Sequence, residues 1–418
     1  MSHHPSPRLW SFARVFLTLT FGLLAIAVAQ AAPAPKEIRL GTLYADSGPF
    51  ATSSLSQFQG LQFWVSQVNH KGGVYVKAYG KKIPVKLIAY NDRSSTTTAA
   101  TLYNQLITQD RVDILAADFG SVLTSVAVPI AQEHKMLLFD QTGTGASFFT
   151  KNNPYIVLTS LPTSGVWPYS LADFLKTQKQ ITRVALIYAT NDFTGSQADT
   201  LRQRLRGSHV KLVYDHGVPT STSSYTVLLH NIQAAKPDAV IEFGYPNNDI
   251  AFLQDLRASG MKFNMVFTIF PGQLFALFKS NVGEPALAYK YTYPTPPLLV
   301  YNKVNYGMGL DAFRAAFHQA TGKEVNFLNI AGYNAGLIIQ KTLETAPSMD
   351  QLALRRGVES FSGKLHTLDG LFKIDPATGA QVGETLPVGQ FVPGKRGLTV
   401  HLLYPPRLAT GKAVYPAP

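Results

Sequence analysis

The sequence of 418 residues contains no cysteine. Disulfide bonds and thiolate chemistry are therefore excluded, and the fold must be stabilised by the burial of apolar side chains. The lack of a cysteine near the end of the N-terminal leader also argues against a lipid anchor on that residue type.

Charged residues are few, at 15% of the chain, whereas hydrophobic residues make up 46%. This is the composition of a globular protein, and the length exceeds what one hydrophobic core normally supports, so we expect two domains. The net charge is +12. The basic residues are dispersed, with only short groups such as "KK" at 81–82 and "RR" at 355–356. A solvated basic surface is therefore expected, and no nucleic-acid partner.

Sequence motifs of common enzymes are missing as well. The chain has no G-x-S-x-G, no H-E-x-x-H and no phosphate loop that ends in G-K-[ST]. "GTGASF" at 143–148 lacks the full glycine pattern of a dinucleotide turn, and the ten histidines show no metal-binding spacing. We therefore predict no catalytic activity, no cofactor and no metal. An enzyme remains an alternative that turnover by the purified protein would support.

The one long apolar run lies near the N-terminus, from Val15 to Ala29, after Arg8 and Arg14. A basic start, a short apolar stretch and small residues in "AQA" are typical of a secretory signal peptide. We predict cleavage after Ala31, or else after Ala29. Removal of the two arginines lowers the net charge from +12 to +10. No later run reaches the about 20 apolar residues that a membrane span needs, so we expect a periplasmic protein, with free secretion as the alternative.

Two parts of the chain, 85–121 and 210–246, share one pattern. Each has a β-branched strand, a Ser/Thr cluster suited to a helix N-cap, an amphipathic helix, an Asp, an apolar strand and a Phe-Gly corner. Strand–helix–strand units of this spacing indicate parallel sheets flanked by helices. "EIRLGTLYA", "QFQGLQFWVSQVN" and "RVALIYA" continue the alternation. The sequence therefore predicts an α/β protein with two Rossmann-like lobes of similar design.

The repeat also predicts where a ligand would bind. Ligands of open parallel sheets bind outside the carboxyl ends of the strands. The equivalent corners are Gly120–Ser121 and Gly244–Tyr245, so Ser121 and Tyr245 are expected on opposite walls of one cleft. A helix that begins near Ser121 leaves backbone N–H groups without partners at its positive end, which suits a carboxylate. Thr142 and Thr144, in "QTGTGAS", follow the next strand and would lie beside it; an ordinary N-cap is the alternative role for each hydroxyl.

At this point the sequence resembles a known family, the type I periplasmic solute-binding proteins of the branched-chain amino acid and amide group, which serve ABC importers. The resemblance is carried, in family order, by "IRLGTLYADSGPFA", "VNHKGGV", "VKLIAYNDRSS", "DRVDILAADFGSVLTSVAVPIAQEHKMLLF", "RVALIYATNDFTG", "KPDAVIEFGY" and "AGYNAGLIIQKTLE". It implies two α/β lobes joined by a three-crossing hinge. The implied division of the chain is a signal peptide at 1–31, lobe 1 at 32–160 plus 291–365, lobe 2 at 161–290 plus 366–400, and a C-terminal tail at 401–418.

The resemblance implies roles for residues on both sides of the cleft. Ser121 and Thr144 would bind a ligand carboxylate, Thr142 would contribute its backbone, and Tyr245 would close from the other lobe. The partners implied are a small-molecule ligand and the membrane permease of an ABC importer, with the binding protein itself a monomer. A sensory protein of the same fold, which signals through a membrane receptor, is the alternative.

Four further positions are assigned by the same resemblance. Ser53 lies where the family often has an aromatic residue at the cleft. Phe193 and Thr194 replace a Tyr that commonly precedes Gly in the turn "NDFTG". Phe327 corresponds to an apolar wall residue.

One departure from the family concerns the ligand ammonium group. Amino-acid binders of this group commonly hold it with an acidic residue in the segment that here reads "FNMVFTIFPGQ", near Ile269 or Phe270. An apolar side chain cannot hold a buried ammonium, which costs several kcal/mol when unpaired. We therefore expect a small carboxylate with an apolar or aromatic body rather than an α-amino acid. Carboxylates near predicted strand ends, which would either substitute or cap turns, are Asp46, Asp118, Asp140 and Glu242.

Overall fold

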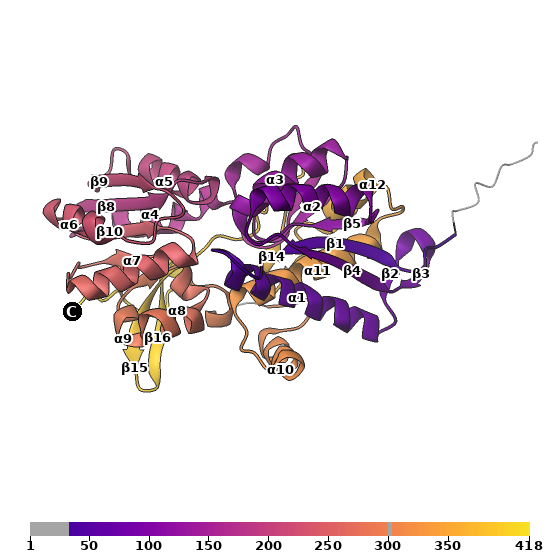
Figure 1. Cartoon of the computed structure of the whole chain (residues 1–418). Helices are drawn as coiled ribbons and strands as arrows, with labels where there is room; N and C mark the ends of the chain where they lie inside the picture. Colours follow the sequence, from indigo (N-terminus) through magenta and orange to yellow (C-terminus); the bar gives the residue numbers. More distant parts are fainter. Residues whose placement is uncertain (1–32, 300–302) are drawn as a thin grey trace, which may run out of the picture. The chain divides into compact units, whose positions relative to one another are not determined.

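Residues 33–299 and 303–418 of the chain are described by a computed structural model (Figure 1). The predicted signal peptide and both of its cleavage positions lie outside the described residues. Within those residues, no helix combines the length and the apolar character needed to cross a membrane. Residues 35–418 form one unit, which contains two main sheets.

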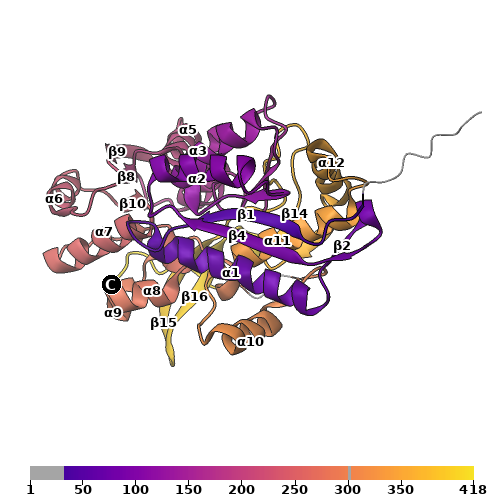
Figure 2. The ribbon, with the colours of Figure 1, turned by 45° about the vertical axis from the view of Figure 1, so that its right-hand side comes forward.

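The first sheet has five parallel strands in the order β4-β1-β5-β6-β7. Helices α1 (Ala51–His70) and α11 (Phe327–Thr345) pack together on one face, and α2 (Thr96–Thr108) and α3 (Gly120–Glu133) pack together on the other (Figures 1 and 2). The strands are β1 (Ile38–Tyr44), β4 (Val85–Asn91), β5 (Ile114–Ala116), β6 (Leu138–Asp140) and β7 (Ile156–Leu158).

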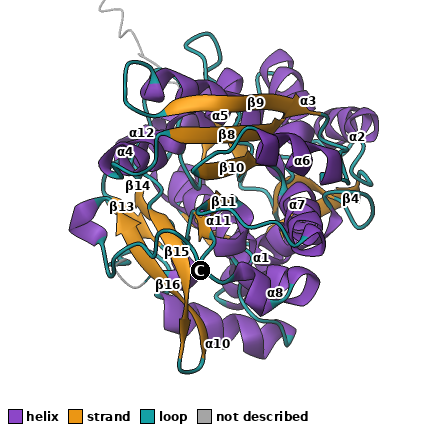
Figure 3. Cartoon of the chain, turned by 90° about the vertical axis from the view of Figure 1, so that its left-hand side faces the viewer, coloured by secondary structure: helices purple, strands orange, loops and turns teal. Residues whose placement is uncertain are grey.

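The second sheet has seven strands in the order β16-β15-β12-β11-β10-β8-β9, parallel from β9 to β12 and antiparallel at β15 and β16 (Figure 3). Its strands are β8 (Arg183–Ala189), β9 (Lys211–Val218), β10 (Ala239–Phe243), β11 (Val266–Phe267), β12 (Tyr291–Thr292), β15 (Val388–Gly394) and β16 (Gly397–Tyr404). The helices of this half are α4 (Pro168–Thr177), α5 (Asp192–Leu205), α6 (Thr226–Ala234), α7 (Pro246–Ser259), α8 (Phe275–Val282) and α9 (Glu284–Leu287).

The predicted repeat is visible in the order of the strands. In the first sheet β1 lies between β4 and β5, and in the second β8 lies between β9 and β10, all parallel. The predicted α/β class with helix-flanked parallel sheets is confirmed. The starts of α3 and α7 therefore occupy equivalent places, each after the strand on the same side of the central one.

The remaining strands and α-helices of the described residues are two short hairpins and two helices. They are β2 (Val74–Val76), β3 (Lys81–Ile83), α10 (Leu310–Thr321), α12 (Gln351–Phe361), β13 (Leu365–Thr367) and β14 (Gly370–Phe372). Two of the predicted lobe boundaries differ from the sheets: β12 begins at residue 291, which the sequence assigns to lobe 1, and β16 runs past residue 400 into the predicted tail. β12 has only two residues, and β15 and β16 form a hairpin that extends the second sheet, so the sequence offers little periodicity by which to assign them. The division into two lobes stays a prediction.

Glycine allows α1 and α11 to approach each other closely. A Cβ atom on Gly60 would lie 2.0 Å from the carbonyl oxygen of Asn329, and one on Gly332 would lie 2.0 Å from that of Gln57. Asn329 also donates from Nδ2 to the Ser56 carbonyl at 2.8 Å. These contacts fix the first turn of α11 against α1.

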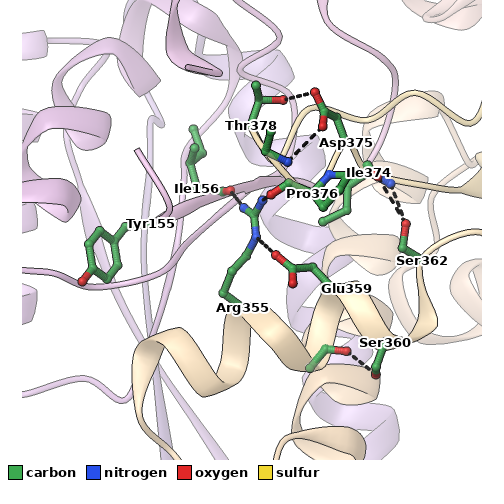
Figure 4. A network of polar contacts seen from close by, with 12 residues as sticks. Tyr155, Ile156, Arg355, Glu359, Ser360, Ser362, Ile374, Asp375, Pro376 and Thr378 are labelled. Carbon is green, nitrogen blue, oxygen red and sulfur yellow. Dashed lines mark hydrogen bonds and ion pairs between the residues drawn. The ribbon is translucent and has the colours of Figure 1, made fainter. Parts of the chain in front are cut away.

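A buried arginine ties the chain before β15 to the edge of the first sheet (Figure 4). Arg355, 4% exposed, donates to Glu359 Oε1 (3.0 Å), to the Pro376 carbonyl (3.0 Å) and to the Ile156 carbonyl on β7. The sequence predicts a solvated residue here, which is wrong, because three acceptors from separate segments satisfy the guanidinium in the interior. The network holds the 374–379 segment beside β7.

Candidate functional site

A cavity of about 340 Å³ lies where the start of α3, the start of α7 and the first turn of α11 meet. This figure includes space open to solvent; the part that water-sized molecules can occupy is about 20 Å³, room for about one water molecule, so a larger ligand requires the walls to move apart. Of the described residues that line it, none carries a charge. The lining residues are Phe119, Gly120, Thr142, Thr144, Ser160, Leu161, Trp167, Phe193, Tyr245, Phe270, Gln273, Phe327 and Leu328.

The start of α3 forms one wall. Gly120 has a φ of 73°, in the left-handed region that favours glycine, which allows the chain to turn from β5 into the helix. The Ser121 and Val122 N–H groups both point at the Tyr245 hydroxyl, with N–O distances of 3.0 Å and 3.4 Å. Ser121 and Tyr245 thus lie together, as the repeat predicts.

The expectation that these N–H groups have no partner is wrong. A tyrosine is long enough to reach the helix start from the other half of the repeat, and its hydroxyl oxygen accepts from both of them. Burial and the nearby carboxylate of Asp192 raise the pKa of Tyr245, so the side chain is neutral. An oxygen acceptor therefore already occupies the position in which the sequence predicts a ligand oxygen.

The hydroxyl groups near this corner are used in different ways. Thr142 Oγ1 accepts from the Gly120 N–H at 3.1 Å and donates to Gln57 at 2.5 Å, so it supports the corner. Ser121 Oγ accepts from the Gly145 N–H at 2.9 Å and does not line the cavity. Thr144 does line the cavity, and its buried Oγ1 has no hydrogen-bond partner among the described residues. Thr144 is the hydroxyl left for a ligand.

Aromatic rings form most of the remaining wall. Tyr245 lies 5.2 Å from Phe193 between ring centroids and nearly parallel to Phe270 at 6.4 Å. Trp167 meets Phe193 edge to face at 5.1 Å, and its indole N–H donates to the Pro162 carbonyl at 2.7 Å. Phe327, at the start of α11, completes the wall. The structure therefore brings four of the predicted aromatic residues to one cavity.

Besides Ser121 and the candidate carboxylates, three predicted residues do not line the cavity. Ser53 is buried in α1. Thr194 lies in the first turn of α5, where its hydroxyl donates to the Ala189 carbonyl, because a threonine near a helix start can satisfy the end of the preceding strand. Ile269 is fully buried beside Phe270, and its carbonyl accepts from Thr292 at 2.9 Å.

The first pair of buried carboxylates, Asp118 and Asp92, lies behind the start of α3. Asp118 Oδ1 accepts from Ser54 Oγ and from the Phe119 N–H, both at 2.6 Å. Burial, followed by the charge of Asp92, holds the pKa of Asp118 well above its usual value, and burial raises that of Asp92 to about 6. Asp118 does not line the cavity, so it stabilises the corner and is not placed to hold a ligand ammonium.

A second pair lies behind the start of α7. Glu242 and Asp249 surround Gly244, on which a Cβ would lie 2.4 Å from Glu242 Oε1 and 3.1 Å from Asp249 Oδ1. Burial, and then the charge of Asp249, holds the pKa of Glu242 well above its usual value, while burial raises that of Asp249 to about 7. Asp249 accepts from the Phe270 N–H at 2.7 Å. Neither acid lines the cavity.

The other two candidate carboxylates, Asp46 and Asp140, do not line the cavity either. Asp46 is exposed, and Asp140 is buried with Oδ1 accepting from the Gly143 N–H at 2.7 Å. Burial holds the pKa of Asp140 well above its usual value. Among the lining residues that the structure describes, nothing supplies a negative charge for an ammonium group.

The sequence interpretation misses two polar residues of the cavity. One, Ser160, donates from Oγ to Asp369 Oδ2 at 2.6 Å. The other is Gln273. It is 2% exposed, lines the cavity, and has no partner for either amide atom within the described parts of the chain. Gln273 is the last residue of the segment "FNMVFTIFPGQ", in which the interpretation looks for an acid at Ile269 or Phe270. The only signal in the sequence was that a polar residue, Gln273, lies three positions after Phe270.

Comparison with known proteins places the chain in a family. Residues 37–395 match the family described as periplasmic binding protein. Over 350 residues the chain is 23% identical to Leu/Ile/Val-binding protein homolog 7 of Brucella melitensis, which covers 81% of this chain and 84% of that protein.

Two solved structures share the fold. One is the branched-chain amino acid transporter substrate binding protein LivJ of Streptococcus pneumoniae in complex with isoleucine, with a TM-score of 0.73 at 15% identity, covering 88% of this chain and 100% of that one. The other is an ABC transporter solute binding protein of R. palustris in complex with benzoate, with a TM-score of 0.71 at 17% identity, covering 90% and 99%. The chain belongs to the periplasmic binding protein family, not to a family of enzymes, and it shares the fold of these two binding proteins.

Proposed function

We propose that this protein captures a small carboxylate with an aromatic or apolar body in the cavity and delivers it to an ABC importer. The observation that carries the proposal is the oxygen of Tyr245 at the start of α3, 3.0 Å from the Ser121 nitrogen. A carboxylate oxygen can replace that hydroxyl, because it is the stronger acceptor at the positive end of a helix. The freed Tyr245 hydroxyl and Thr144 Oγ1 can then donate to the carboxylate.

The lining supports an aromatic acid over an α-amino acid. A ring can pack between Phe193, Trp167 and Phe327, whereas an α-ammonium group would meet no carboxylate among the described lining residues. Of the two ligands named for the structural neighbours, isoleucine carries such a group and benzoate does not. We therefore place benzoate-type acids ahead of amino acids.

The remaining parts of this function are proposals of the same kind. A signal peptide that is cleaved after residue 31 would carry the protein to the periplasm, where a monomer would present its ligand to a permease. A sensory role for the same binding event is distinguished by whether the neighbouring genes encode a permease and an ATPase.

Isothermal titration with benzoate and with L-leucine tests the ligand class. We expect benzoate to bind with a dissociation constant in the micromolar range, about −8 kcal/mol, and leucine at least about tenfold more weakly. Thr144→Val should weaken benzoate binding by about 1.5–3 kcal/mol, because a hydrogen bond to a charged group is lost. Thr101→Val, on the exposed face of α2, is the matched control and should leave binding unchanged. Tighter binding of leucine than of benzoate would contradict the proposal.

A further inference from the structure

We propose that Gln273 is the specificity-determining residue of the cavity and that it selects aromatic carboxylates that carry a ring hydroxyl. The inference rests on the proposed function, since it names the ligand class of the same site. It assigns to Gln273 a role that no motif of the sequence suggests.

The backbone of Gln273 is held on two sides. Its N–H donates to the Phe270 carbonyl at 2.9 Å, which closes the short helical turn η4 (Phe270–Gly272). Its own carbonyl accepts from the Phe327 N–H at 3.2 Å, at the start of α11. The Gly272 N–H is bonded in turn to Thr292 Oγ1 at 3.0 Å. The root of the side chain is therefore fixed between two walls of the cavity, which is what a selective contact requires.

The amide group of Gln273 is buried and unused. Within residues 33–299 and 303–418, neither its Nε2 nor its Oε1 has a hydrogen-bond partner, and Gln273 is among the residues that line the cavity. Buried polar groups in folded proteins nearly always have partners, because an unpaired one loses its hydration without compensation. An amide that is unpaired in the protein, on a residue that lines the cavity, is therefore suited to a ligand partner. Exchange of its nitrogen and oxygen positions changes nothing, since both are unpaired.

The amide sets a requirement that a carboxylate alone does not meet. Nε2 donates and Oε1 accepts, whereas an ionised carboxylate only accepts. The ligand must therefore also carry a donor for Oε1. An ammonium donor is disfavoured, because none of the described lining residues is charged. A neutral hydroxyl on a ring that packs against Phe270 and Phe327 meets the requirement and can accept from Nε2 as well.

The test compares benzoate with the three monohydroxybenzoates on the wild-type protein and on Gln273→Leu. In the wild type, at least one hydroxybenzoate should bind about tenfold or more tightly than benzoate, because a site built to pair a hydroxyl discriminates against ligands that lack it. Gln273→Leu should reduce this ratio to about one by weakening the hydroxybenzoate, with the benzoate affinity changed less than about threefold. Isothermal titration supplies both affinities.

Two controls keep the outcomes distinct. Gln180→Leu, an exposed glutamine outside the cavity, should retain the wild-type ratio. Gln273→Met keeps an unbranched side chain of similar length and replaces the leucine variant if circular dichroism shows that the latter is unfolded. If the wild type binds neither benzoate nor any hydroxybenzoate, the proposed function fails. If it binds all of them equally, or if the Gln273 variants keep the preference, the role of Gln273 is refuted while the proposed function stands.

Discussion

The start of α3 and the start of α7 are the same corner of the repeat, used in opposite ways. At the first, Gly120 and Ser121 have small side chains, so the backbone N–H groups there can be reached from the opposite side; at the second, Tyr245 has a large side chain whose hydroxyl oxygen accepts from the Ser121 N–H. The repeat supplies two equivalent positions. Because their side chains differ in size, the start of α3 offers backbone N–H groups and the start of α7 supplies the tyrosine that occupies the space in front of them. A site between repeats thus depends on where the two copies differ.

The acids behind the two corners differ in how they are supported. Asp118 accepts two hydrogen bonds, from Ser54 and Phe119, whereas neither carboxyl oxygen of Glu242 has a hydrogen-bond partner among the described residues. Asp249, the partner of Glu242, accepts from the Phe270 N–H and so connects this second pair to a wall of the cavity. The second corner is therefore the less well satisfied of the two.

Of the substitutions that test this difference between the two corners, Gly120→Ala, at the start of α3, is expected to have the largest effect. The residue has a positive φ, and its Cβ would lie 3.1 Å from Cε1 and 3.2 Å from the hydroxyl oxygen of Tyr245. We expect a loss of about 1–3 kcal/mol in the free energy of unfolding, measured by urea titration, and weaker benzoate binding. Gly195→Ala, inside α5 with no atom within 4 Å of its Cβ, is the matched control and should stabilise the protein by about 0.5–1 kcal/mol. Equal effects of the two substitutions on stability would show that the start of α3 does not need glycine at this position.

A smaller effect is expected from the second acid pair, Glu242 and Asp249, on the pH dependence of the free energy of unfolding. Asp249 has a pKa of about 7 in the folded protein against an ordinary value of 3.8. The folded state therefore holds more protons than the unfolded state between these values, so the contribution of Asp249 to the free energy of unfolding should fall as pH rises through that window and level off above about pH 7. Glu242→Gln removes the carboxyl group whose pKa burial and the charge of Asp249 hold well above its usual value, so that no proton has to be taken up there on folding. It should raise the free energy of unfolding at pH 8 by about 1 kcal/mol or more and change it less at pH 5.

The same experiment has an internal reference. Glu133→Gln, at the exposed end of α3, should shift the unfolding curves equally at both pH values. A Glu242→Gln protein with the same pH dependence as the wild type would mean that Glu242 takes up no proton on folding.

The sequence predicted the scaffold of the site better than its contents. The repeat and the corner positions follow from local periodicity, so the meeting of Ser121 and Tyr245 could be predicted without coordinates. What Tyr245 does there could not be, because a side chain that reaches across from a distant segment leaves no local pattern. Ser53 and Thr194, transferred by resemblance, do not line the cavity.

Gln273 illustrates the same limit. It lies in a short turn without periodicity, and its importance comes from having no partner, which only the packed structure reveals. The sequence shows that no acid is present near Phe270. This directed attention to the segment that ends in Gln273, but not to Gln273 itself, which replaces the function of the acid in our proposal.

The central claim is that a ligand carboxylate takes the place of the Tyr245 hydroxyl at the start of α3. A crystal structure of the protein with its tightest-binding benzoate-type acid tests it most directly. We predict a carboxylate oxygen within hydrogen-bond distance of the Ser121 nitrogen and Thr144 Oγ1, with Tyr245 displaced from Ser121. A bound acid with its carboxylate away from α3, and Tyr245 still accepting from the Ser121 N–H, would contradict the account.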